Sequence, residues 1–213
     1  MQQRRSLKRN APTRAPKQKF IIFSEGKNTE PHYFLAVRRD LLGALVDLEV
    51  IDAAGAPMTI AAKACERSAA MKRNRGRKSS FQEGDQVWAV FDRDEHPKVS
   101  EAIERCRVGN VEVAFSDPCF ELWLILHFDD FDRPDDRHQL QAALAKKCEG
   151  YDPKGAKSGD FSKLMPAVGA AEERAERQLA RRVEEGRPPR RPFTSVYKLT
   201  KELRKAHLAY KGV

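Results

Sequence analysis

Residues 20–31 read FIIFSEGKNTEP, an apolar run followed by a polar turn and a proline. The apolar run predicts a buried strand, and the proline is typical of the first turn of a helix. A glycine-lysine pair after a strand also occurs in phosphate-binding loops of the form GxxxxGK[ST]. That motif needs a glycine five residues before Gly26 and a hydroxyl residue after Lys27, but Ile21 and Asn28 stand there. The segment therefore predicts a strand, a tight turn and a helix, without a phosphate-binding loop of this form.

Strands are predicted at four short apolar segments, residues 20–23, 48–51, 87–91 and 111–115. The helices expected between and after them cover residues 31–37, 58–72, 99–107, 118–128, 136–147, 165–183 and 194–210. Short apolar strands that alternate with helices are typical of a parallel sheet with right-handed crossovers and helices on both faces. One glutamate interrupts the second and the fourth segment, so we expect these two strands nearer the edges. The sequence thus predicts a Rossmann-like α/β fold, with a mainly parallel sheet of about four strands and a helical C-terminal extension.

The formal net charge of +9 is unevenly distributed along the chain. Residues 1–19 contain seven lysines and arginines and no acidic residue, which leaves +2 for the other 194 residues (9 minus 7). A second concentration of arginines, at 174–191, is interleaved with glutamates. Such segments either neutralise the phosphates of nucleic acid or form solvated surface, and composition leaves both open. We expect a basic disordered arm at 1–18, an α/β core at 19–130 and the helical extension at 131–213.

Composition argues against several classes of protein. No apolar run approaches the ~20 residues of a membrane span, and the N-terminus lacks the apolar segment of a secretory signal. The four cysteines form no CxxC pair, so we expect neither a zinc site nor a disulfide framework. The sequence therefore predicts a cytoplasmic protein with reduced thiols.

Acidic residues closely follow three of the predicted strands. Glu25 follows the first strand, Asp92 and Asp94 follow the third, and Asp117 follows the fourth, with Glu121 one helical turn later. Ligands bind beyond the carboxyl ends of the strands in open parallel sheets, and alternate residues of an extended segment point the same way. Carboxylate oxygens are the ligands that Mg²⁺ and Mn²⁺ prefer. These residues therefore indicate a divalent-cation site, with solvated loop acids and helix caps as the alternative.

Three ordered motifs resemble the RloB-like family: FIIFSEGKNTEPHYF at 20–34, AVFDRDEH at 89–96 and DPCFELWLILHF at 117–128. The resemblance runs from about residue 19 to residue 128, with a weaker similarity at 194–199. The glutamate after the first strand and the DxD after a later strand also look like the TOPRIM domain of topoisomerases, primases and OLD-type nucleases. One departure is Asp117, where asparagine is expected more often, so its role as a cap or a ligand stays open.

The resemblance implies a metal-dependent phosphodiesterase or nuclease that uses Mg²⁺ or Mn²⁺. Glu25, Asp92 and Asp94 would be its catalytic and metal-binding residues, and Glu121 would be a further ligand or an orienting base. It also implies a role in prokaryotic anti-phage defence (abortive infection), together with an AAA/ABC-type ATPase of the RloA kind. The rival hypothesis is a non-catalytic protein that binds nucleotide or nucleic acid and regulates an ATPase complex. Both DNA and RNA, including transfer RNA, are candidate substrates.

Four residues near these acids are candidates for contacts with phosphate or nucleic acid: Lys27, Asn28, Arg93 and His96. The alternatives are an ordinary exposed lysine at position 27 and an ordinary loop histidine at position 96.

The turn before the first helix also has a structural interpretation. Gly26 lets the chain turn tightly so that Glu25 points at the ligand. Thr29 and Glu30 are expected to cap a helix that begins at Pro31. Glu30 could instead be an acid close to the metal, and of the two roles we favour the cap.

Overall fold

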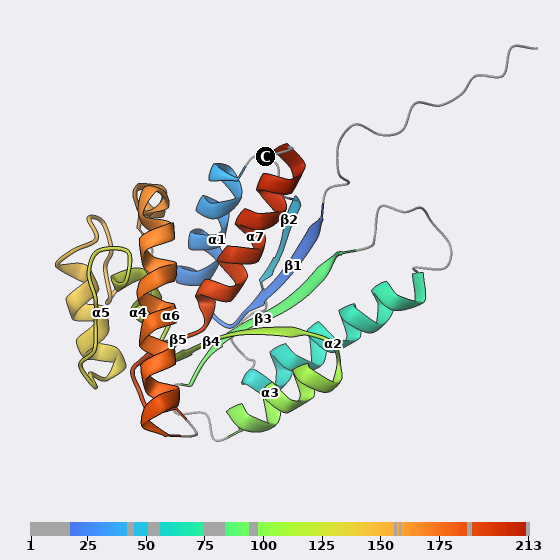
Figure 1. Cartoon of the computed structure of the whole chain (residues 1–213), viewed down its shortest axis with the longest axis horizontal. Helices are drawn as coiled ribbons and strands as arrows, with labels where there is room; N and C mark the ends of the chain where they lie inside the picture. Colours follow the sequence, from blue (N-terminus) through green and yellow to red (C-terminus); the bar gives the residue numbers. More distant parts are fainter. Residues whose placement is uncertain are drawn as a thin grey trace, which may run out of the picture.

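Figure 1 shows the computed structural model of the chain, an α/β fold built around one sheet. The structure describes residues 18–41, 45–50, 56–74, 84–93, 98–155, 157, 159–186 and 189–211. The basic arm up to residue 17 and two expected site residues, Asp94 and His96, lie outside the described residues.

The predicted parallel sheet is confirmed. Its strands are β1 (Lys19–Ser24), β2 (Leu45–Val50), β3 (Gln86–Asp92), β4 (Glu112–Asp117) and β5 (Phe193–Thr194). They lie in the order β2-β1-β3-β4-β5, with the first four parallel and β5 antiparallel to β4. Strand β2 is at an edge of the sheet, as its interrupted pattern predicts. Strand β4 lies next to the edge, because only two of its residues pair with β5. Strand β5 was not predicted, because two residues are too few to show an alternating pattern.

The predicted helices are present, with shifted boundaries. They are α1 (Thr29–Asp40), α2 (Pro57–Asn74), α3 (Val99–Val108), α4 (Glu121–Ile125), α5 (Arg137–Ala145), α6 (Val168–Glu185) and α7 (Val196–Lys211). A 3₁₀ helix, η2 (Phe161–Ala167), precedes α6 because Pro166 lacks the N–H that an α-helix interior requires. The last helix begins two residues later than expected because the residues before it pair with β4. Among the residues that the structure describes, no helix is long and apolar enough to cross a membrane.

One face of the sheet is covered by α2 and α3 (Figure 1). Ile21 of β1 and Phe91 of β3 are buried there with Ile60 of α2 and Ala102 of α3. Each fully buried side chain of the size of isoleucine or phenylalanine contributes roughly 1.5–3 kcal/mol to stability. This packing fixes β1 and β3 side by side, so that their carboxyl ends face the same edge of the sheet.

The opposite face is covered by elements from both ends of the chain. Phe20 of β1 and Trp88 of β3 belong to the same core as Phe34 of α1, Leu164 of η2 and Leu199 of α7. Figure 1 shows α1 and α7 over this face of the sheet. Residues beyond position 131 therefore complete the core of the sheet.

Replacing Leu199 by alanine tests this shared core. Leu199 is fully buried, so we expect Leu199→Ala to lower the free energy of unfolding by about 2–5 kcal/mol. Unfolding in urea, followed by tryptophan fluorescence and by circular dichroism, should still give one coincident transition. The control is Leu208→Ala on the same helix, where the side chain is 47% exposed and the expected change is within about 0.5 kcal/mol. Two separate transitions would contradict a shared core.

Candidate functional site

The carboxyl ends of β1, β3 and β4 meet at one edge of the sheet. Ser24 pairs with Val90 across β1 and β3, and Asp92 pairs with Ser116 across β3 and β4. The N–H of Glu25 continues the first ladder by donating to the carbonyl of Val90 at 3.3 Å. The chain therefore leaves β1 directly beside the end of β3, which brings Glu25 close to Asp92.

Four carboxylates gather at this edge, and we name them the acidic cluster: Glu25, Glu30, Asp92 and Glu121. Burial raises the pKa of Asp92 well above its usual range, and the negative charges of the other three raise it further. Oδ1 of Asp92 is buried and has no hydrogen-bond partner in the described part of the chain. Since a buried carboxylate oxygen is normally hydrogen-bonded, this atom is suited to a ligand that brings positive charge.

Glu30 was not expected in the cluster, because the cap interpretation was favoured. Its carboxylate is buried beside Gly26, where a Cβ atom would lie 1.9 Å from Oε2 of Glu30. Burial, opposed in part by backbone hydrogen bonds and assisted by Glu121 and Glu25, raises the pKa of Glu30 to about 7. The sequence does contain a signal for this position, since Glu30 precedes the buried Tyr33 and Phe34 by three and four residues on α1.

The start of α1 also differs from the expectation. The helix begins at Thr29 instead of Pro31, and Asn28 occupies the N-cap position without a side-chain capping bond. The hydroxyl of Thr29 donates to the carbonyl of Lys157 at 2.7 Å, so it ties the turn to a distant segment. Gly26 is needed for space against Glu30, which adds a reason for glycine to the tight turn that was predicted.

Glu121 is held by residues that sequence reasoning did not single out. It is the first residue of α4 and is buried, and its Oε1 accepts hydrogen bonds from Tyr151 (2.6 Å) and Gln141 (3.2 Å). Burial and the adjacent Glu121 raise the pKa of the Tyr151 hydroxyl, so Tyr151 stays a neutral donor at ordinary pH. These two donors fix the Glu121 side chain while adding no charge to the cluster.

The side chains of the acidic cluster are of the chemical type that Mg²⁺ and Mn²⁺ prefer. All four offer carboxylate oxygens, and one buried oxygen of Asp92 has no hydrogen-bond partner among the residues that the structure describes. Within the described part of the chain, no three acidic, histidine or cysteine side chains are close enough to hold an ion directly. Asp94, the remaining expected ligand, lies outside that part.

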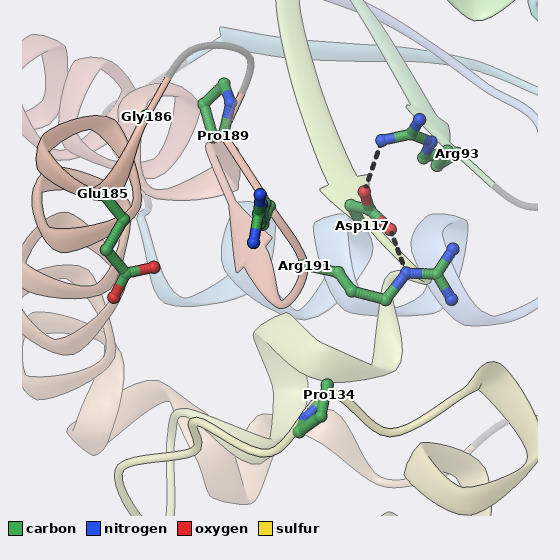
Figure 2. Close-up of a pocket in the computed structure, with 8 residues that line it drawn as sticks. Arg93, Asp117, Pro134, Glu185, Gly186, Pro189 and Arg191 are labelled. Carbon is green, nitrogen blue, oxygen red and sulfur yellow. Dashed lines mark hydrogen bonds and ion pairs between the residues drawn. The ribbon is translucent and has the colours of Figure 1, made fainter.

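Asp117 does not join the acidic cluster. Its fully buried carboxylate contacts Nη1 of Arg93 at 3.0 Å and Nε of Arg191 at 3.4 Å (Figure 2). Asp117, for which the roles of cap and metal ligand were open, instead forms ion pairs with two arginines. Arg93, expected to contact phosphate, points toward Asp117, while Lys27 and Asn28 are exposed at the turn after β1.

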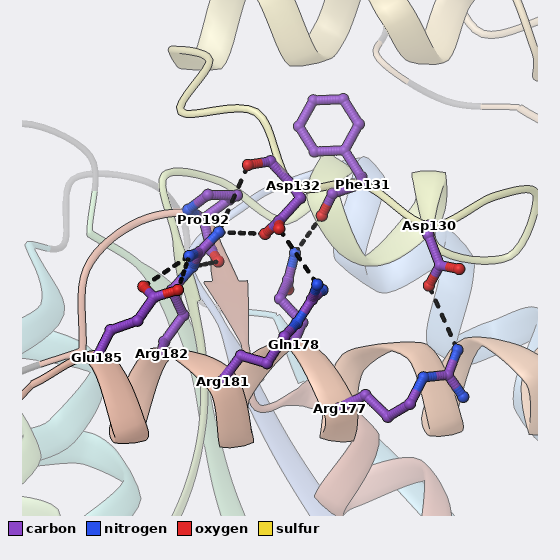
Figure 3. A network of polar contacts seen from close by, with 9 residues as sticks. All are labelled: Asp130, Phe131, Asp132, Arg177, Gln178, Arg181, Arg182, Glu185 and Pro192. Carbon is purple, nitrogen blue, oxygen red and sulfur yellow. Dashed lines mark hydrogen bonds and ion pairs between the residues drawn. The ribbon is translucent and has the colours of Figure 1, made fainter.

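Several arginines of the second basic segment are paired with acids or carbonyls. Arg177 contacts Asp130, and Arg181 and Arg182 both contact Asp132 (Figure 3). The three pairs join α6 to the loop before α5, and Gln178 donates to the carbonyl of Phe131 in the same loop. This part of α6 therefore serves to hold a loop, and its positive charge is largely offset.

The raised pKa of Glu30 predicts how stability depends on pH in the metal-free protein. Glu30 binds a proton more tightly in the folded than in the unfolded protein, so its contribution to stability is present below pH 4.5 and is lost as pH rises to about 7. We therefore expect the difference in unfolding free energy, wild type minus Glu30→Gln, to fall by on the order of 1–3 kcal/mol across this window. Urea titrations in EDTA at several pH values measure it.

The wild type is compared with Glu30→Gln because the protonation of a second buried group changes stability with pH in the opposite direction. Burial lowers the pKa of His127 to about 4, so its contribution is present above pH 6.5 and is lost as pH falls. Both proteins contain His127, and its effect cancels in the difference. A difference that stays constant between pH 4 and pH 8 would contradict the place given to Glu30.

Comparison with known proteins identifies one family. The family model described as "RloB-like protein" matches residues 20–203. The match begins at the second residue of β1 and includes the ends of the strands that bear the site. Neither a curated protein nor a solved structure matches the chain. Because the match extends over most of the 213 residues, from β1 into α7, the chain belongs to the RloB-like family.

Proposed function

We propose that this protein is a metal-dependent nuclease that cleaves phosphodiester bonds at the acidic cluster. The observation that carries the proposal is the gathering of four carboxylates at the ends of β1 and β3, where burial and the neighbouring carboxylates raise the pKa of Glu30 and of Asp92. Such a set is costly in a protein without a cation and is suited to one that binds Mg²⁺ or Mn²⁺. Perturbed carboxylates beyond the strand ends of an open α/β sheet also mark the usual place of an active site.

The four acids differ in exposure, and this difference suggests their roles. Asp92 and Glu121 would hold the ion, since Asp92 has the buried Oδ1 and the carboxylate of Glu121 is fixed by two neutral donors. A bound divalent ion would orient the scissile phosphate and offset the negative charge that develops on it. Glu25 is only half-buried, so it can reach a water molecule at the substrate and accept its proton. Asp94 would add a further ligand from the segment after β3.

The biological setting that we propose follows the family resemblance. Members that resemble this chain are expected in prokaryotic anti-phage defence beside an AAA/ABC-type ATPase of the RloA kind. We infer that nucleic acid is the substrate and that such an ATPase is the partner. The charge distribution supports the first inference, because the acid-free basic segment at 1–19 can neutralise phosphates.

Replacing Glu25 by glutamine tests the catalytic role. Glutamine keeps the size of the side chain but removes its basicity and its charge. A general base contributes about 10²–10⁴-fold, so we expect the cleavage rate to fall by this factor in Mn²⁺ or Mg²⁺. Binding of nucleic acid should persist, because removal of a negative charge does not weaken attraction to phosphate. Gel assays with labelled DNA and RNA measure cleavage, and anisotropy measures binding.

Glu101→Gln is the matched control for this experiment. Glu101 lies exposed on α3 on the far side of the sheet from α4, and its replacement changes the net charge equally. Full activity in Glu25→Gln would refute the role of this residue. No cleavage of DNA or RNA by the wild type, with and without the partner ATPase, would contradict the nuclease and favour the regulatory hypothesis.

The cation site can be tested without activity. A ligand that binds only the folded protein stabilises it, by about 2.7 kcal/mol when its concentration is 100 times its Kd. We expect Mn²⁺ to raise the melting temperature of the wild type and of Glu101→Gln. The double variant Asp92→Asn/Glu121→Gln should lose this stabilisation, as measured by scanning calorimetry. Equal stabilisation of the wild type and the double variant would place the cation elsewhere.

A further inference from the structure

A second feature at the same edge of the sheet is a hollow of about 580 Å³, which we name the arginine hollow. Arg93, Arg190 and Arg191 line it together with Asp117 and Glu185 (Figure 2). It lies between the ends of β3 and β4 and the chain that follows α6. The acidic cluster does not line this hollow, so it is a separate binding volume.

The arginine hollow carries an excess of positive charge. Glu185 is paired through both oxygens with Nη1 of Arg182, at 2.7 and 2.8 Å, and its charge is therefore offset. Asp117 is then the one carboxylate left against three arginine side chains among the residues that line the hollow in the described structure. The chemistry of this volume favours an anion.

Asp117 orients two of these arginines without using up their donors. It contacts Arg93 through Nη1 and Arg191 through Nε, so each of these ion pairs engages a single nitrogen of the guanidinium group. Both arginine side chains are about half exposed (51% and 45%), whereas Asp117 is fully buried beneath them. A guanidinium group has five N–H donors in a fixed plane and is well suited to phosphate oxygens. The buried Asp117 thus holds two guanidinium groups in place.

The arginine hollow and the acidic cluster meet at consecutive residues. Asp92 belongs to the acidic cluster, and Arg93 is the next residue, whose N–H donates to the carbonyl of Ser116 at 2.9 Å. Successive side chains of an extended chain point to opposite sides. The arginine hollow and the acidic cluster therefore lie on opposite sides of the end of β3 and are joined through these two consecutive residues.

We propose that the arginine hollow binds a backbone phosphate of the nucleic-acid strand that is cleaved at the acidic cluster. This inference rests on the proposed nuclease function and specifies its substrate as a polynucleotide strand. Arg191, Arg190 and Arg93 would contact the backbone phosphate, and these contacts are independent of base sequence. They would set the position of the strand relative to Glu25 and Asp92.

The test is binding of a fluorescein-labelled single-stranded oligonucleotide to the full chain in EDTA, which prevents metal-dependent cleavage. Arg190→Gln and Arg191→Gln should each weaken binding about tenfold, as expected for loss of a charge-assisted hydrogen bond. Each should also reduce the slope of log affinity against log salt by about one. Arg190→Gln is included because Arg191→Gln removes an ion pair of the buried Asp117 and could weaken folding.

Arg177→Gln is the matched control, because it removes the same charge from α6 at a residue paired with Asp130 outside the hollow. Affinity and salt slope unchanged in Arg177→Gln and reduced in both hollow variants would support the proposal. Equal effects in all three variants, or no effect in any, would overturn it.

If the hollow variants bind weakly although the wild type cleaves nothing, the phosphate site stands and the nuclease fails. If the wild type cleaves and the hollow variants bind normally, the nuclease stands and the phosphate site fails.

Discussion

Mutual repulsion among four carboxylates is the constraint on which the rest of this structure depends. Burial alone penalises a charged carboxylate, and three further negative charges around Asp92 add to that penalty. A fold can keep such a set only if packing elsewhere holds the side chains in place. Here the two apolar faces of the sheet supply that packing, with β1 and β3 between α2 and α3 on one side and α1 and α7 on the other.

The surroundings of the cluster hold Glu121 through neutral donors and leave space for Glu30. Gly26 leaves the space that the Glu30 carboxylate occupies, and Tyr151 and Gln141 hold Glu121 through neutral donors. In contrast, Asp117 at the end of β4 contacts two arginines. The sheet edge thus separates Asp117, which is paired with two cationic side chains, from Glu121, which is held by neutral donors. Such a separation costs stability and is typical of functional sites.

The strands and helices of the core were predictable because each buried strand is a short apolar run and each helix has its own periodic pattern. Glu25, Asp92 and Glu121 were predictable for a related reason, since position at a strand end, together with the family resemblance, nearly determines where a side chain lies. The remaining features depend on contacts that are distant in sequence. Tyr151 contacts Glu121, and β5 pairs with β4, both from beyond residue 131, and no local pattern predicts such contacts. The cap was favoured for Glu30 because a carboxylate in the first turn of a helix is usually a cap or a favourable charge near the helix dipole, and that pattern does not reveal that the side chain is also buried near Glu25 and Glu121.

The step from Asp92 to Arg93 explains how one strand can serve two opposite charges. An extended chain directs successive side chains to opposite sides, so the end of β3 offers a carboxylate to one side and a guanidinium group to the other. The same hydrogen-bond ladder with β4 fixes both residues, because Asp92 pairs with Ser116 and the N–H of Arg93 donates to the carbonyl of Ser116. A cation and an anion bound on the two sides would therefore be held in one rigid frame. For a substrate that is itself a chain of phosphates, this geometry would hold one phosphate at the arginine hollow while another lies at the acidic cluster, on the opposite side of the strand end.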